Sequence, residues 1–170
     1  MIVDNDYIWI FIRRRKMKFS NPLIVVTNME KAKQFYYDVL GLEVVVDFGA
    51  NVTLKGGITL QTKDTWSTFI DKDENEILFG GNAAELYFEE DDFDDFIQKI
   101  NNIVDIHYVH PMLQHSWGQR VIRFYDPDKH IVEVGENIIM VVRRFLNSGL
   151  SIEDTAIRMD VPIDYVKSCL

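Results

Sequence analysis

The sequence predicts an α+β protein made of two βαβββ modules followed by a C-terminal helical extension. Three observations support this fold class. Strand and helix patterns occur twice in the same order, cap and apolar positions of the two copies share one spacing, and the pattern becomes wholly helical after Gly135. With 170 residues, 47% of them hydrophobic, the chain is long enough to bury a substantial core.

The first copy begins with strand patterns, from Met17–Phe19 into the apolar run Pro22–Val26. Asn28 is a typical helix N-cap, and Gly41 follows the last residue with helical spacing, so we expect a helix between them. Gly-rich turns then separate three further strands. Their expected ranges are 42–48, 51–55 and 58–62.

The second copy repeats this order. Leu86–Phe88 reads as a strand and Asp92 as a cap, and apolar residues at helical spacing continue to Ile103. The three strands expected after this helix are 106–109, 119–125 and 130–135.

One constant shift superposes the two copies. Asn28 aligns with Asp92 (92 − 28 = 64), and the same shift aligns four further pairs of apolar residues. These are Met29 with Phe93, Ala32 with Phe96, Tyr36 with Ile100, and Leu60 with Phe124. A shift without gaps through strand, cap and helix indicates an internal duplication.

These patterns divide the chain into four parts. Residues 1–16 match nothing that follows and are interpreted as an arm or an over-long start. The first module is 17–81 and contains a polar insertion, 63–81, which is either a lid or extra hairpin or a plain surface loop. The second module is 82–137. The extension is 138–170. Its last part, 149–170, has the rhythm of a helix-turn-helix, but Arg158 and Lys167 are the only basic residues of that stretch, which favours a packing or dimerisation role over DNA binding.

Charge and cysteine content exclude several classes of protein. The net charge of −9 repels phosphate backbones, so no nucleic acid partner is expected. The apolar run Tyr7–Ile12 is too short to span a membrane, and charge follows it, the reverse of a secretory signal. Cys169 is the only cysteine, which excludes an internal disulfide and is consistent with a cytoplasmic protein.

Two stretches resemble the vicinal oxygen chelate superfamily, which contains glyoxalases, bleomycin-resistance proteins and extradiol dioxygenases. The first is NPLIVVTNMEKAKQFYYDVLGLEVV at 21–45, a strand, a polar cap and a helix that ends in Leu-Gly. The second is WGQRVIRFYDPDKHIVEVGE at 117–136, with Asp-Pro-Asp at a turn and a glutamate in the last strand. With the repeat, the resemblance covers about residues 18–137.

The resemblance implies that the two modules form a curved mixed sheet, shaped as a cup around a small-molecule pocket, in a protein that forms homodimers. In metal-using members, the first and last strand of each module each supply one ligand to a divalent ion. That ion acts as a Lewis acid on vicinal substrate oxygens.

The ligand positions of the family match this sequence only in part. The first-strand positions fall on Asn21 and Glu85, and the last-strand positions on Thr59–Gln61 and Glu133. Glu85 and Glu133 are therefore the candidate metal ligands, an incomplete set of hard oxygen donors that suits a weakly held Mg²⁺ or Mn²⁺. A cofactor-free protein is the other expectation.

Glu133 is the leading candidate for a catalytic residue, with Glu85 as its partner. A carboxylate in an apolar strand needs a partner or a wet pocket, and we favour a pocket over an ion pair with Arg120 or Arg123. Two carboxylates in one cup would repel each other, which makes one a candidate proton shuttle. The candidate ligand-binding residues are Trp117, His110, Arg123 and Asn21.

Strand alternation places His107 and His110 on opposite faces of their strand, so the two would not hold one metal ion together.

Three functions stay open. The first is a lyase or isomerase of small oxygenated substrates, similar to lactoylglutathione lyase, that works with or without the help of a metal ion. The second is a non-catalytic, antibiotic-sequestering protein of the bleomycin-resistance type. The third is a regulatory module whose C-terminal helices contact another chain.

Overall fold

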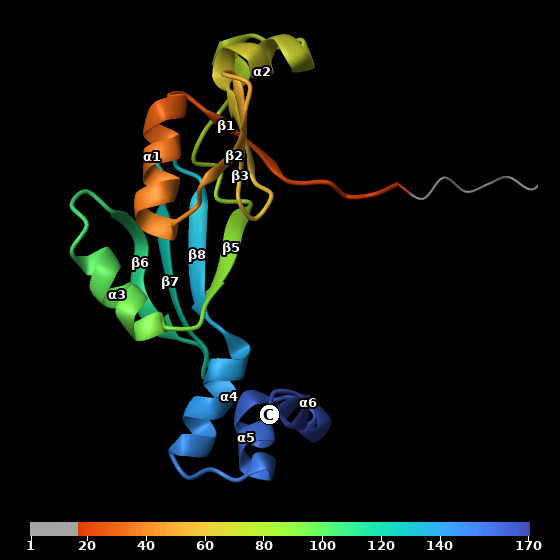
Figure 1. Ribbon diagram of the computed structural model, residues 1–170, viewed down its shortest axis with the longest axis vertical. Helices are drawn as coiled ribbons and strands as arrows, with labels where there is room; N and C mark the ends of the chain where they lie inside the picture. The colour runs from red at the N-terminus through yellow and green to blue at the C-terminus, as the bar shows by residue number, and fades with distance from the viewer. Residues whose placement is uncertain (1–16) are drawn as a thin grey trace, which may run out of the picture.

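The computed structural model describes residues 17–170, so the expectations for residues 1–16 lie outside the described part of the chain (Figure 1). The first set of elements is β1 (Leu23–Val26), α1 (Met29–Leu40), β2 (Val44–Asp47), β3 (Asn51–Leu54), β4 (Thr59–Thr62), α2 (Lys63–Ile70) and the 3₁₀ turn η1 (Glu74–Glu76). The second set is β5 (Glu85–Glu90), α3 (Phe93–Asn101), β6 (His107–Gln114), β7 (Arg120–Tyr125) and β8 (Ile131–Glu136). The C-terminal helices are α4 (Ile138–Asn147), α5 (Ile152–Met159) and α6 (Ile163–Ser168).

The strands form two mixed sheets of four strands with the same topology. Their orders are β1-β4-β3-β2 and β5-β8-β7-β6. In each sheet the first and last strands of the module pair in parallel, and the other neighbours pair antiparallel. This is the α+β class and the βαβββ repeat that the sequence predicts.

The two equivalent helices begin with equivalent caps. Asn28 Oδ1 accepts a hydrogen bond from the Lys31 backbone N–H, and Asp92 Oδ1 accepts one from the Asp95 backbone N–H. Gly41, in the left-handed conformation (φ +69°), ends α1. The apolar faces of α1 and α3 each cover one face of a sheet, and each helix contributes buried residues to an apolar core.

A buried polar cluster joins the two modules. The Tyr36 hydroxyl, on α1, donates to Asp126 Oδ2 at 2.8 Å, and His130 Nδ1 lies 2.8 Å from the same oxygen. The backbone N–H of Thr27 donates to Asp128 Oδ1 at 3.1 Å. These bonds fix the start of α1 against the β7–β8 turn, so the Asp-Pro-Asp motif ties the modules together.

Three sequence expectations are corrected. Met17–Phe19 is not a strand, and regular structure begins at Leu23. The insertion is neither a hairpin nor a plain loop, because it folds as α2 and η1. The constant shift of 64 does not extend to the last strand of each module. Leu60 pairs with Ile24 of β1 and Val134 with Phe88 of β5, so Leu60 aligns with Val134 (134 − 60 = 74) and not with Phe124. The ten extra residues lie in the two hairpins β6–β7 and β7–β8 of the second module, which are longer than their equivalents in the first.

The C-terminal helices form a unit with its own apolar core beyond the end of the second sheet (Figure 1). Buried residues of this core include Val141, Val142, Phe145, Met159 and Val166. Among residues 17–170 no helix has the length and apolar character that crossing a bilayer requires.

Candidate functional site

A row of side chains crosses all four strands of the second sheet on its open face, the face opposite α3. Strand pairing places Tyr87 beside Glu133, Glu133 opposite Arg123, and Arg123 opposite His110. Neighbours in such a row lie on one side of a sheet and in contact. Three of the predicted site residues are therefore brought together by register alone.

Arg123 is the centre of this row. Its Nε donates to Glu85 Oε2 at 2.9 Å, its Nη1 lies 3.2 Å from His110 Nε2, and its Nη2 forms an ion pair with Glu133 Oε2. Glu133 is buried, 4% exposed, whereas the Glu85 side chain is 37% exposed. We call Glu85, His110, Arg123 and Glu133 the arginine cluster. The sequence favoured a pocket for Glu133 over an ion pair, and the structure contains the ion pair with Arg123.

Bonding on both sides sets the tautomer of His110. Its Nδ1 lies 2.8 Å from the Pro111 carbonyl oxygen, which only accepts, and its Nε2 faces an arginine N–H, which only donates. In this arrangement Nδ1 donates to the Pro111 carbonyl oxygen, and Nε2 accepts from Arg123. A β-bulge between Tyr108 and His110 also corrects an expectation, because His107 pairs with Tyr125 and His110 with Arg123, so both histidines lie on the open face.

Aromatic and amide side chains continue the open face toward the end of the sheet next to α4. Gln119 Nε2 donates to the Tyr87 hydroxyl at 2.9 Å, and Gln119 Oε1 accepts from Trp117 Nε1 at 3.3 Å. The Tyr87 hydroxyl in turn donates to Glu89 Oε1 at 3.1 Å. His115 and Trp117 stack with ring centroids 4.2 Å apart, and burial together with the charges of Arg123 and the nearby His110 lowers the pKa of His115.

The equivalent place in the first sheet lacks charged groups. Register aligns Thr59 with Glu133 and Thr53 with Arg123, and the Asn21 side chain donates to Thr59 Oγ1. No contact among the described residues joins Asn21 to the arginine cluster. The two modules have therefore diverged, and only the second carries ionisable chemistry on its open face.

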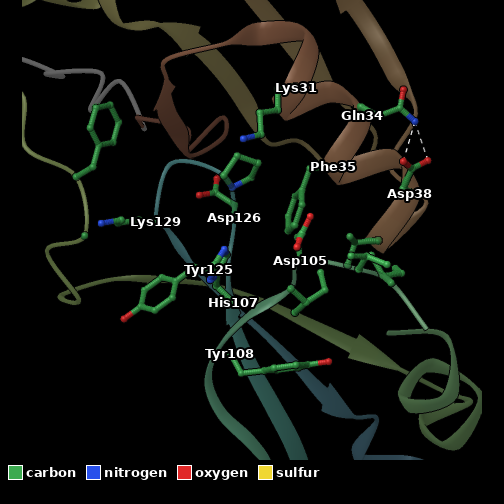
Figure 2. A pocket seen from close by; sticks show the side chains of 17 residues that line it. Lys31, Gln34, Phe35, Asp38, Asp105, His107, Tyr108, Tyr125, Asp126 and Lys129 are labelled. Atoms are coloured by element: carbon green, nitrogen blue, oxygen red, sulfur yellow. Dashed lines mark hydrogen bonds between the residues drawn. The ribbon is translucent and has the colours of Figure 1, made fainter. Parts of the chain in front are cut away.

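A large cavity lies elsewhere, between α1 and the second sheet. Its volume is about 1220 Å³, and Glu133 is not among the residues that line it. Figure 2 shows Phe35 of α1 on one side and Tyr108 and Tyr125 on the other. Its one buried carboxylate, Asp126, is already satisfied by Tyr36, His130 and two backbone N–H groups. We take the arginine cluster as the candidate functional site because four ionisable side chains, among them the buried Glu133, come together there.

The arginine cluster does not fit a divalent metal ion. The Arg123 guanidinium lies between the two carboxylates, and it also takes the free lone pair of His110. Within residues 17–170 no group of three or more His, Cys, Asp or Glu side chains is arranged as a metal site. The positively charged guanidinium of Arg123 thus occupies the position at which the family's metal-using members would bind a metal ion.

The sequence matches the glyoxalase-like domain family over residues 19–139. This chain belongs to that family. The two βαβββ sheets are those of the vicinal oxygen chelate superfamily, as the sequence motifs suggested. A search of curated proteins gave no match.

Solved structures share the fold of this glyoxalase-like protein. A protein of unknown function from Agrobacterium tumefaciens is 35% identical, with a TM-score of 0.64 over 73% of this chain and 97% of that one. A lactoylglutathione lyase from Agrobacterium tumefaciens is 25% identical, with a TM-score of 0.53 over 72% and 97%. A glyoxalase/bleomycin resistance/dioxygenase family enzyme from Burkholderia phytofirmans is 13% identical, with a TM-score of 0.59 over 69% and 96%.

Sequence reasoning missed several residues of the open face. Tyr87 and Gln119 were not singled out, although the alternation in β5 places Tyr87 on the same face as Glu85. Glu136 was also missed: it is 2% exposed and accepts hydrogen bonds from Arg120 and Arg144. A second glutamate in the last strand, followed by arginines, was the available signal.

Proposed function

We propose that this glyoxalase-like protein binds planar cationic small molecules on the open face of its second sheet, without a resident metal ion and without a chemical step. The observation that carries the proposal is the engagement of both candidate catalytic carboxylates, and of His110, by Arg123. A base that is already paired with an arginine is a poor proton acceptor.

Charge and exposure on the open face support a cationic, aromatic ligand. Glu85, Glu89 and Glu133 outnumber Arg123 there, and the whole chain carries a net charge of −9. Tyr87 is 47% exposed and Trp117 is 38% exposed, so both offer aromatic surface. Aromatic faces attract cations, and the negative field raises the local concentration of such a ligand.

The test is a fluorescence titration with proflavine, a planar aromatic cation, on chelator-treated protein. We expect saturable binding of one dye per chain that weakens at high salt. Glu85→Gln and Trp117→Ala should each weaken binding by about tenfold, roughly 1.4 kcal/mol.

Lys72→Gln, a charge change on an exposed residue after α2, is the matched control and should bind as wild type. The anionic dye 8-anilinonaphthalene-1-sulfonate tests the role of charge. Binding of both dyes with equal affinity, or no saturable binding of proflavine, would refute the proposal.

A lyase or isomerase is the second candidate function, and one observation favours it. Glu133 Oε2 is buried, and its polar partner is Arg123 alone. Release of Arg123 by a bound substrate would leave this oxygen as a base. Conversion of the methylglyoxal–glutathione hemithioacetal to the thioester, with and without added Mg²⁺, Mn²⁺ or Ni²⁺, tests it. Activity that Glu133→Gln abolishes would support this function over sequestration.

A further inference from the structure

The C-terminal extension, α4–α6, contacts the loop that borders the open face. It lies almost wholly outside the family match, which ends at residue 139. Its helices have their own core, so the unit does not need the loop for its own packing. The contacts between the extension and the loop are therefore not explained by the packing of the extension itself.

Three contacts fasten the extension to the loop 115–118. Arg144 Nη2 donates to the Gly118 carbonyl oxygen at 2.7 Å, and Arg158 Nη1 donates to the Ser116 carbonyl oxygen. Gly118 has a φ of +97°, and a side-chain carbon there would collide with the Phe145 ring. The loop conformation is thus matched to α4 and α5.

The same loop carries the stacked pair His115 and Trp117. Trp117 is linked through Gln119 to Tyr87, which lies next to Glu133 in the row across the sheet. The stack leaves Trp117 38% exposed. The loop therefore presents an aromatic surface beside the arginine cluster.

We propose that the C-terminal extension is a positioning element that holds the His115–Trp117 pair as one wall of the ligand site and so sets which ligands bind. This rests on the proposed function, ligand binding at the open face. Family members without such an extension would lack this wall.

The experiment compares Arg158→Gln and Gly118→Ala with Arg143→Gln. Arg158 is exposed, so its substitution should leave the fold intact. Arg143, on α4, is also exposed, its side chain donates to Met140 Sδ, and it serves as the matched control. We expect the first two variants to bind proflavine about tenfold more weakly and the control to bind as wild type. Arg158→Lys, which keeps a donor, should recover part of the affinity.

A second readout needs no ligand. The titration of His115, followed by NMR, should lie below the ordinary value in the wild type and in Arg143→Gln. It should move toward the ordinary value in Arg158→Gln and Gly118→Ala, because the loop leaves the neighbourhood of Arg123. An unmoved titration with unchanged dye affinity would overturn the positioning role. If proflavine fails to bind the wild type while the titration moves as expected, only the proposed function fails.

Discussion

Arg123 contacts three side chains that would otherwise be potential metal ligands. Two are carboxylates and the third is the Nε2 lone pair of His110. Two oxygens and one imidazole nitrogen are donors that Mn²⁺, Fe²⁺ or Zn²⁺ accepts, but within residues 17–170 no three His, Cys, Asp or Glu side chains are placed to hold one metal ion. The guanidinium therefore holds together groups that do not form a metal site by themselves.

Arg123→Ala tests this role of the guanidinium. We expect the variant to be less stable by about 3 kcal/mol in urea unfolding, because Glu133 loses its partner while buried. Added Mn²⁺ or Zn²⁺ should not raise its melting temperature, since the three side chains do not converge on one point. Arg143→Ala is the control and should keep the wild-type stability. One metal ion bound per chain in calorimetry, together with a raised melting temperature, would contradict this expectation.

At the scale of single elements, the caps were predictable and the sheet irregularities were not. The side chains of Asn28 and Asp92 signal a helix start by local chemistry alone. The bulge before His110 depends on pairing with β7, so period-two alternation wrongly separated His107 and His110 onto opposite faces. Helix α2 was missed because its eight residues carry no side-chain cap bond. Local signals predict local structure, whereas register needs the partner strand.

The equivalence of the two modules predicts equal effects at the two caps. Asn28→Ala and Asp92→Ala each remove one hydrogen bond to an otherwise unpaired backbone N–H. Each should lower the free energy of unfolding by about 1 kcal/mol in urea denaturation. Asp91→Ala, one residue before the second cap, should change it by far less. Unequal effects at the caps would indicate that α1 and α3 contribute differently to the folded state.

At the scale of the whole molecule, the sequence predicted the modules but not the bonds between them. Repeat order and motifs predicted the two βαβββ units and singled out the four residues of the arginine cluster. The register across β5, β8, β7 and β6, which gathers the arginine cluster, is set only when the sheet forms. The same holds for the pair Tyr36 and Asp126, which are 90 residues apart in the chain.

Tyr36→Phe tests whether the modules unfold together. The change removes one donor from the buried Asp126 carboxylate and leaves the ring in place. We expect a loss of about 1–3 kcal/mol in the free energy of unfolding, because a buried carboxylate oxygen loses a hydrogen bond. Fluorescence and circular dichroism should still give one coincident transition. Two separate transitions would show that this bond alone couples the modules.

Glu136 links the second sheet to the extension, so its titration should couple acid stability to this junction. Burial raises the pKa of Glu136, but hydrogen bonds from Arg144 and Arg120 outweigh it and leave the pKa below its ordinary value of 4.5. A carboxyl group with a lowered folded pKa stabilises the fold above its unfolded pKa, and this contribution is lost as the pH falls through the folded value.

Urea unfolding of the wild type should therefore become easier as the pH drops below about 4.5. Glu136→Gln should be less stable at neutral pH by about 3 kcal/mol, because two arginines lose their charged partner. Its stability should also fall less steeply in the acid range, since the titrating group is gone. Glu43→Gln, in the exposed ion pair with Lys55, should keep the wild-type slope. Parallel curves for the wild type and Glu136→Gln would mean that the two arginines do not depress the titration of this carboxyl group, and that other acidic groups control acid unfolding.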